Sequence, residues 1–237
     1  MAAVTPPQRV LVIDIGGTGI KAALLDADGN PLADRRRCPT PPQATPPELL
    51  KSVETLIQPF GDFDALSFGF PGAIKNGVIL TAPNLGTQNW AGTRLAQLAE
   101  QRFHRPARLV NDATLHGLGL IAGQGIEVAL TLGTGMGFAL FSDGIPAPQI
   151  ELGRHPASRA PTYDDFVGDA ALKRAGEAAW KDHVQETLSR IAALVNFDRL
   201  YLGGGNARLF SPAELPENVR LANNETGLTG GARLWRV

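Results

Sequence analysis

The sequence contains the same local unit twice: an apolar run, a glycine cluster and a second apolar run. The first copy covers residues 10–25 around Gly16-Gly17-Thr18-Gly19, and the second covers residues 128–141 around Gly133-Thr134-Gly135-Met136-Gly137. A short apolar run bounded by turn residues is typical of a buried strand, so each copy predicts a β-hairpin. A chain that repeats this unit is expected to form two similar α/β halves with a cleft between them.

Helical and extended patterns fill the rest of the chain. Apolar residues at helical spacing predict helices near residues 48–60, 95–103, 113–122 and 188–195. Short apolar runs predict strands over 32–37, 65–70, 108–110 and 200–202, and Asn76-Gly77 predicts another hairpin. A helix is expected over 226–235, and the proline-rich segment 39–47 is expected to be a surface connector. The predicted domains are residues 1–111 with 222–237, and residues 112–221.

Charge and cysteine content argue against several classes of protein. The 237 residues carry 22 Lys and Arg against 23 Asp and Glu, so no basic field is expected that would hold nucleic acid or a membrane. The single cysteine, Cys38, excludes an internal disulfide and a multi-thiolate zinc site. Neither a signal-peptide pattern nor an apolar run of membrane-spanning length is found. We therefore expect a cytoplasmic protein.

The glycine clusters contain more glycine than a hairpin turn requires, since one glycine at positive φ usually suffices. Consecutive backbone N–H groups without a nearby Cβ form an anion-binding concavity, and a threonine hydroxyl adds a donor. The clusters therefore suggest phosphate binding, and the alternative is that they are only tight turns. Neither cluster ends in the Lys-Ser/Thr of a Walker A loop or has the Gly-x-Gly-x-x-Gly pattern before a helix.

Two aspartates next to predicted strands are candidates for chemistry. Asp14 lies in the first apolar run, where a carboxylate requires a partner, either Mg²⁺ beside a phosphate or the backbone of the turn. Lys21 is either a phosphate ligand or a solvated strand residue. Asp112 follows a strand and precedes a helix, so it either caps that helix or accepts the proton of an attacking hydroxyl.

Several motifs follow one another along most of the chain. They are Asp14-Ile15-Gly16-Gly17-Thr18-Gly19-Ile20-Lys21, Pro71-Gly72, Pro83-Asn84-Leu85, Asn111-Asp112-Ala113, Leu132-Gly133-Thr134-Gly135-Met136-Gly137, Glu151-Leu152-Gly153 and Gly203-Gly204-Gly205-Asn206. In this order they resemble the ROK (repressor, open reading frame, kinase) family, and in particular its short, polyphosphate-glucokinase-like branch. The resemblance implies a two-domain actin/hexokinase-like (ribonuclease H-like) fold with duplicated halves.

The resemblance also implies a sugar kinase that uses ATP or polyphosphate to phosphorylate a hydroxyl of glucose or another hexose. Asp112 is the implied general base, and Mg²⁺ is implied near Asp14, directly or through water. The implied phosphate and nucleotide ligands are Asp14, Gly16, Gly17, Thr18, Lys21, Gly133, Thr134, Gly135, Gly137, Gly203, Gly204, Gly205 and Asn206. The implied sugar ligands are Gly72, Asn84, Asn111, Asp112, Glu151 and His155. Relatives suggest a homodimer.

The chain departs from the family pattern after Glu151-Leu152-Gly153. The family has a His directly after this motif, a ligand of sugar or zinc, whereas this chain has Arg154 there and His155 one residue later. The Cys-rich zinc loop of many relatives has no counterpart, so no zinc is expected, and no DNA-binding helix-turn-helix is expected before residue 10. Two alternatives remain: a non-catalytic sugar-binding regulator, which Arg154 suggests, and a phosphohydrolase of the same fold.

Some basic and aromatic residues receive weaker assignments. Arg35-Arg36-Arg37 is expected to be a solvated strand end rather than a contact for polyphosphate. His104, His116 and His183 show no metal-ligand spacing. Trp90 either lines the sugar site or packs in the core, and the core is expected for Trp180 and Trp235.

Overall fold

The computed structural model describes residues 6–157, 159–222 and 224–237. The chain forms two compact units, one made of Met1–Gly119 with Thr226–Val237 and the other of Leu120–Glu225. The second unit is therefore an insertion into the first, and each is described in turn. The boundaries predicted from the sequence, after residues 111 and 221, fall earlier in the chain than those of the two units.

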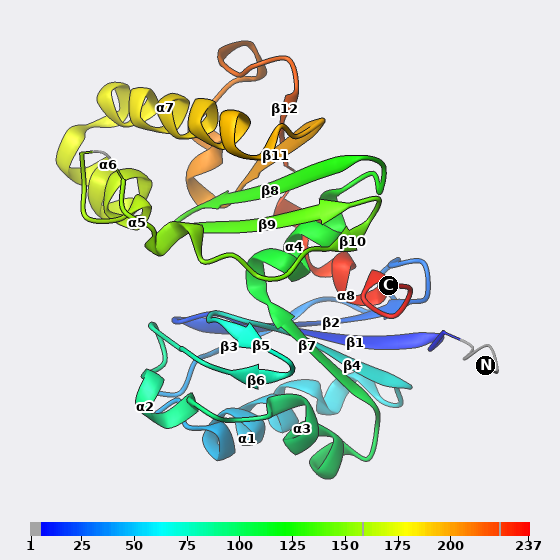
Figure 1. Cartoon of the computed structure of the whole chain (residues 1–237). Helices are drawn as coiled ribbons and strands as arrows, with labels where there is room; N and C mark the ends of the chain where they lie inside the picture. Colours follow the sequence, from blue (N-terminus) through cyan, green and yellow to red (C-terminus); the bar gives the residue numbers. More distant parts are fainter. Residues whose placement is uncertain (1–5, 158, 223) are drawn as a thin grey trace. The chain divides into compact units, whose positions relative to one another are not determined.

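The first unit is built on a five-stranded mixed sheet in the order β3-β2-β1-β4-β7 (Figure 1). Its strands are β1 (Arg9–Ile15), β2 (Gly19–Asp26), β3 (Arg36–Pro39), β4 (Ala65–Phe70) and β7 (Ala107–Asn111), with a separate hairpin of β5 (Ile74–Lys75) and β6 (Val78–Ile79). Its α-helices are α1 (Pro46–Ile57), α2 (Thr87–Trp90), α3 (Leu95–Phe103), α4 (Asp112–Leu120) and α8 (Gly230–Arg233). β1 and β2 form the predicted antiparallel hairpin, while β4 pairs in parallel with both β1 and β7.

Both faces of this sheet are covered, because alternate residues of β1 point to opposite faces. The odd-numbered residues from Leu11 to Ile15 pack with residues of α1 and α3. The even-numbered Val10 and Val12 pack with Leu115 of α4 and Ala232 of α8. Asp14 continues the even-numbered series, so the same alternation turns its side chain toward α4.

The second unit repeats this topology. Its sheet has the order β10-β9-β8-β11-β12, with β8 and β9 antiparallel and with β11 parallel to both β8 and β12. The strands are β8 (Ile126–Leu132), β9 (Met136–Ser142), β10 (Ile145–Pro146), β11 (Arg199–Gly203) and β12 (Val219–Leu221). The helices are α5 (Tyr163–Val167), α6 (Asp169–Ala175) and α7 (Glu177–Val195), which supply much of this unit's core. In each unit an antiparallel hairpin is followed by two parallel strands, so the predicted duplication is confirmed.

Short 3₁₀ segments complete the structure. They are η1 (Gln58–Phe60), η2 (Leu152–Arg154), η3 (Gly205–Leu209), η4 (Pro212–Glu214) and η5 (Asn224–Thr229). The helix predicted over 226–235 is confirmed in part: the segment is helical up to Arg233, but Asn224–Thr229 is 3₁₀ and only Gly230–Arg233 is α-helical. Gly230 and Gly231 lie where an added Cβ would meet Leu115 O at 1.9 Å and Val12 Cγ2 at 2.3 Å, so close packing requires them.

Two further differences from prediction lie between β2 and α1, and the helix predicted over 188–195 begins earlier, at Glu177. The strand expected over 32–37 begins only at Arg36. Residues 36–39 are the ones that pair with the start of β2, with Arg36 opposite Ala22 and Pro39 opposite Gly19. The connector expected over 39–47 is shorter, since α1 begins at Pro46, a position in the first helical turn where proline is tolerated.

Two of the three tryptophans lie in the cores, whereas Trp235, also expected there, is half-buried and packs against the edge of a core cluster. Trp90 and Trp180 are fully buried, and their indole N–H groups donate to Ala44 O at 2.6 Å and Val167 O at 2.9 Å. Trp90 is thus a core residue. Within the described part of the chain, no helix combines the length and apolar character required to cross a membrane.

Candidate functional site

Asp14 is a buried carboxylate held by two basic side chains. Only 5% of the residue is exposed. Lys21 Nζ, from the paired position on β2, lies 3.3 Å from Asp14 Oδ2, and His116 Nε2, from α4, lies 3.2 Å from the same oxygen. The sequence suggested Mg²⁺ or the backbone of the turn as the partner of Asp14. The structure adds two side-chain partners, Lys21 and His116.

The surroundings shift the pKa values of Asp14 and His116 in opposite directions. Burial raises the pKa of Asp14, but the hydrogen bond and charge of His116, together with Lys21, outweigh burial and lower it below its ordinary value. Burial lowers the pKa of His116, whereas the hydrogen bond to Asp14 and the charges of Asp14 and Asp112 raise it above its ordinary value. Both shifts favour the ionised pair.

His116 is a site residue that metal-ligand spacing does not find. The available signal is its position four residues after Asp112, which puts both side chains on one face of α4. That signal becomes informative only when the fold shows that α4 covers the even-numbered side of β1. The fold therefore supplies the partner that sequence reasoning missed.

Asp14 is suited to Mg²⁺ only in combination with a phosphate. Mg²⁺ is usually bound through one or two carboxylates together with substrate phosphates and water. Among the described residues, no group of three or more His, Cys, Asp or Glu side chains is arranged to hold a metal ion. A cation beside Asp14 would therefore complete its coordination with phosphate oxygens and water.

The first glycine turn is shaped by close contacts. Gly16 N donates to Gly19 O at 2.9 Å. A Cβ on Gly16 would lie 3.0 Å from Gly19 O, and one on Gly17 would lie 3.1 Å from Asn84 Cβ. Gly16, Gly17 and Gly19 do not have positive φ, so the expectation that the turn needs positive φ is wrong. The structure places Asn84, a predicted sugar ligand, directly beside this turn, whose Thr18 is exposed.

Two basic side chains border the first glycine turn. Arg37 lies opposite Lys21 in the β2–β3 pairing. A Cβ on Gly19 would lie 3.3 Å from Arg37 Nε. The three arginines 35–37 are exposed, as expected for a solvated strand end, yet Arg37 also reaches the turn. The approach to the turn is therefore positively charged.

Asp112 opens α4 at the carboxyl end of β7. Its Oδ1 and Asn111 Oδ1 both accept the N–H of Ala113, at 2.8 and 2.9 Å, so Asn111, directly before the helix, makes the N-cap bond and Asp112 adds a second acceptor from the first helical position. Asn111 Nδ2 donates to Gly72 O at 3.2 Å and thereby ties α4 to the segment after β4. Gly72 has no room for a side chain, because a Cβ would lie 1.9 Å from Thr81 O.

Gly133 and Gly205 stand out among the glycines of the second unit. Neither has positive φ, and a Cβ built on either would meet nothing within 4 Å. Neither backbone conformation nor internal packing therefore requires glycine at these positions. They follow β8 and β11, neighbouring parallel strands whose carboxyl ends share an edge of the sheet. Open α/β sheets bind ligands at that edge, and backbone without Cβ lets an anion approach its N–H groups closely.

Gly204, in the turn after β11, is required by the fold. Gly204 has φ +87°, and its Cβ would lie 2.2 Å from Leu132 O. Gly137 and Gly203 both lie opposite Thr131, on the two strands that flank β8. The glycine turn after β11 therefore packs against the end of β8, and Thr134 is exposed in the turn that follows β8.

Asp164 holds the glycine turn after β8 from the side. Its Oδ1 accepts the N–H of Met136 at 2.7 Å. The same oxygen lies 2.5 Å from a Cβ built on Gly135 and 2.6 Å from one built on Gly153, and the latter Cβ would also lie 2.4 Å from Met136 O, so a side chain at either position would displace Asp164 or the turn. The carboxylate thus joins this turn to the predicted sugar-binding segment that begins at Glu151.

Asp169 connects the two glycine turns of the second unit. Its backbone N–H donates to Gly133 O at 2.8 Å, and its Oδ1 accepts from Asn206 Nδ2 at 2.6 Å. Asn206, a predicted nucleotide ligand, therefore also braces the turns. Asp164 and Asp169 were missed by sequence reasoning, because their partners lie about thirty or more residues away in the chain.

The segment from Glu151 to His155 lies at the surface of the second unit. Glu151, Arg154 and His155 are exposed. Gln149 Nε2 donates to Glu151 Oε1, and His155 Nδ1 lies 2.9 Å from Pro156 O. The residue that departs from the family pattern, Arg154, is thus one that can meet a ligand.

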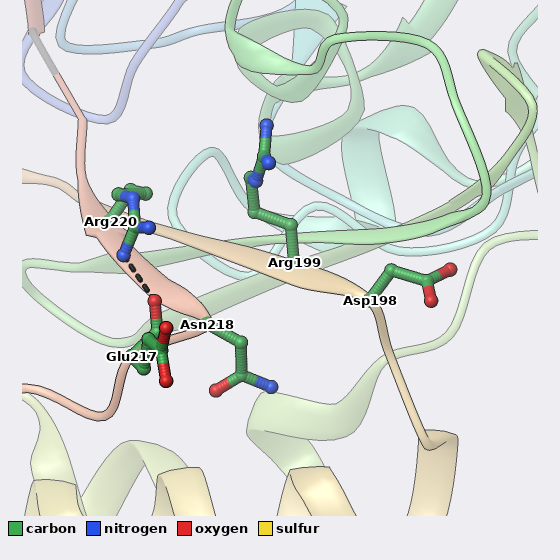
Figure 2. A pocket seen from close by; sticks show the side chains of 5 residues that line it. All are labelled: Asp198, Arg199, Glu217, Asn218 and Arg220. Carbon is green, nitrogen blue, oxygen red and sulfur yellow. Dashed lines mark hydrogen bonds between the residues drawn. The ribbon is translucent and has the colours of Figure 1, made fainter.

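A surface pocket lies at the opposite edge of the second sheet. It is lined by Asp198, Arg199, Glu217, Asn218 and Arg220, which lie at or next to the starts of β11 and β12 (Figure 2). Arg220 Nη1 donates to the backbone oxygen of Glu217, and the side chains drawn point in different directions. The pocket gathers none of the predicted site residues, so the glycine turns remain the candidate site.

Comparisons with known proteins identify relatives of this chain. The ROK family model matches residues 10–148. The polyphosphate glucokinase of Mycobacterium tuberculosis strain H37Rv is 35% identical over 214 residues, which are 83% of this chain and 77% of that protein. The crystal structure of the polyphosphate/ATP-glucomannokinase from Arthrobacter sp. strain KM matches at 28% identity with a TM-score of 0.81, covering 98% of this chain and 99% of that chain.

A second solved structure extends the fold comparison. The ROK family glucokinase from Streptomyces griseus, in complex with glucose and AMPPNP, has a TM-score of 0.76 at 20% identity and covers 96% of this chain and 99% of that chain. The two structural matches and the duplicated sheets confirm the predicted α/β, actin/hexokinase-like fold.

Proposed function

Since this chain belongs to the ROK family, we propose that it is a sugar kinase that transfers a phosphoryl group from polyphosphate or ATP to a hydroxyl of glucose or a similar hexose. The observation that carries the proposal is the pair Gly133 and Gly205, whose bare backbone has no explanation within the fold. Two such positions at the carboxyl edge of one sheet suit a ligand with several phosphates, because each turn can offer N–H groups to an anion.

Asp112 is the group that we assign to the sugar hydroxyl. The hydrogen bond from Ala113 orients its carboxylate at the start of α4. In the proposed reaction the hydroxyl oxygen attacks the terminal phosphorus and its proton passes to Asp112. The bond to the bridging oxygen breaks, and ADP or a shortened polyphosphate leaves. Most of the rate enhancement would come from positioning and charge.

The first glycine turn is proposed to face the phosphoryl donor. Lys21 and Arg37 border it and would balance the charge of a polyphosphate or triphosphate chain. Mg²⁺ bound by phosphate oxygens and Asp14, directly or through water, would neutralise charge that develops on the phosphates. Asn84, Asn111, Glu151 and His155 would supply donors and acceptors to the sugar.

A coupled assay of sugar phosphorylation tests this function. A panel of hexoses would be offered with ATP and with polyphosphate, while phosphate release is measured in parallel without sugar. Asp112→Asn is expected to lower kcat by about 10²- to 10⁴-fold, since that is the usual contribution of a general base. Full activity of this variant would contradict the role of Asp112.

The same assay separates the alternatives. Sugar-dependent thermal stabilisation without turnover would indicate a binding regulator, and phosphate release without sugar would indicate a phosphohydrolase. Location in the cytoplasm and a homodimeric state stay predictions.

A further inference from the structure

His116 belongs to no predicted set of ligands, yet it contacts the most buried carboxylate of the candidate site. Its Nε2 lies 3.2 Å from Asp14 Oδ2. The contact follows from the fold, because Asp14 is on the side of β1 that packs with α4, where Leu115 joins Val10 and Val12. The ring therefore reaches a strand residue that is far from it in sequence.

The backbone of the C-terminal segment confines the imidazole. A Cβ built on Gly227 would lie 3.2 Å from His116 Cδ2 and 3.3 Å from Cγ, closer than side chains normally approach. The absence of a side chain at Gly227 leaves the space that the ring occupies. His116 is thus held between Asp14 on its Nε2 side and Gly227 against the ring.

Lys21 contacts the same oxygen of Asp14 but is held less firmly. The Lys21 side chain is 55% exposed, whereas that of His116 is 29% exposed. A long, exposed lysine side chain loses rotamer freedom when it forms an ion pair, and this loss offsets much of the attraction. The short imidazole on a helix is the more rigid of the two partners.

We propose that His116 is a positioning residue, which fixes the Asp14 carboxylate beside the first glycine turn and links it to α4, the helix that begins with Asp112. This inference rests on the proposed function, since it assigns Asp14 to the phosphoryl donor and Asp112 to the sugar. The contact between His116 and Asp14 would then hold Asp14, which faces the phosphoryl donor, at a fixed position relative to Asp112, which faces the sugar.

Binding of an inorganic donor without sugar tests the proposal independently of turnover. Calorimetric titration of tripolyphosphate in the presence of MgCl₂ would compare wild type, His116→Ala and His116→Gln. We expect His116→Ala to weaken binding about 10- to 100-fold, as is usual when the partner of a metal-site ligand is removed. His116→Gln should recover part of the loss, because its amide nitrogen can occupy the place of Nε2.

His104→Asn is the matched control, because His104 is an exposed histidine at the end of α3 whose left-handed backbone, φ 53°, asparagine tolerates. In kinetic assays His116→Ala should raise the KM for the donor and leave the KM for the sugar nearly unchanged. Loss of general stability would lower both affinities and would not be rescued by glutamine.

Wild-type binding of tripolyphosphate by a folded His116→Ala protein, confirmed by its thermal midpoint, would overturn the proposal. If His116→Ala does not fold, the single variant His116→Gln is compared with the double variant that carries both His116→Gln and Asp14→Asn. Equal affinity of these two proteins for tripolyphosphate would overturn the proposal as well. Donor binding that depends on His116 in a protein without turnover would reject the kinase function and retain the positioning role.

Discussion

Adjacent residues of one turn have different reasons to be glycine. At Gly204 the backbone is left-handed and Leu132 O leaves no room for a Cβ, whereas at Gly205 the backbone is ordinary and the space is open. Gly204→Ala should therefore lower the free energy of unfolding by about 1–3 kcal/mol through strain and overpacking. Gly205→Ala should leave it unchanged or raise it slightly.

For binding of the phosphoryl donor, Gly205→Ala should have the larger effect, although it has the smaller effect on stability. A methyl group on residue 205 would project into the space proposed for the phosphoryl donor, so Gly205→Ala should raise the KM for ATP or polyphosphate. Denaturant titration and steady-state kinetics of the two variants provide the measurements. Unchanged donor affinity in Gly205→Ala would mean that this open space is not used by the donor.

The residue scale also shows the limit of sequence reasoning at Asp14. Its burial could be predicted, because one carboxylate interrupts an apolar run. Its partner His116 could not, since the contact joins a strand to a helix that follows six other strands and three α-helices in the chain. Likewise, the close contact of Gly17 with Asn84 depends on tertiary packing and not on local turn geometry.

At the scale of elements, the strands and helices with strong periodicity were predictable. The two hairpins, β4 and α1 follow from local patterns that tertiary packing reinforces. The segment α5–α6 has no such pattern, because its helices are short and bury only a few side chains each. Its importance comes from Asp164 and Asp169, which bind turns that are distant in sequence.

The α5 segment offers a matched pair of adjacent aspartates. The Asp164 carboxylate accepts the N–H of Met136, whereas the Asp165 carboxylate accepts from the hydroxyl of Thr162 in its own turn. Asp164→Ala should leave a partly buried N–H without its partner and destabilise the second unit by about 1–3 kcal/mol. Because this carboxylate also supports Gly135, the donor KM should rise.

Asp165→Ala removes the same charge and should affect donor kinetics little. Asp164→Asn, which keeps an acceptor oxygen, should fall between wild type and Asp164→Ala. Denaturation curves and donor KM values for the three variants make the comparison. Equal effects of Asp164→Ala and Asp165→Ala on the donor KM would show that donor binding depends on the negative charge and not on the contact of Asp164 with the turn.

At the scale of the whole molecule, the chain leaves the first unit after Gly119 and returns to it at Thr226. The duplicated motif predicts two similar halves, but it does not show that the end of the chain completes the first one. The returning segment is anchored there by polar contacts: Ser67 Oγ donates to Gly231 O at 2.7 Å, and Trp235 Nε1 donates to Ser67 Oγ at 2.9 Å. A buried hydroxyl of β4 thus joins the two parts of this unit.

Gly231 tests how far the returning segment stabilises the first unit. A Cβ there would lie 2.3 and 2.5 Å from the two methyl carbons of Val12, which is fully buried in β1. Gly231→Ala should therefore destabilise the protein by about 1–3 kcal/mol through overpacking, while Gly205→Ala adds the same methyl group in open space and serves as the control.

Hydrogen exchange of the Gly231→Ala protein should show faster opening of the β1 and β2 amides and unchanged protection of β8 and β9, because the two units have separate cores. Equal loss of protection in both sheets would instead mean that the inserted unit and its host unfold as a single cooperative structure.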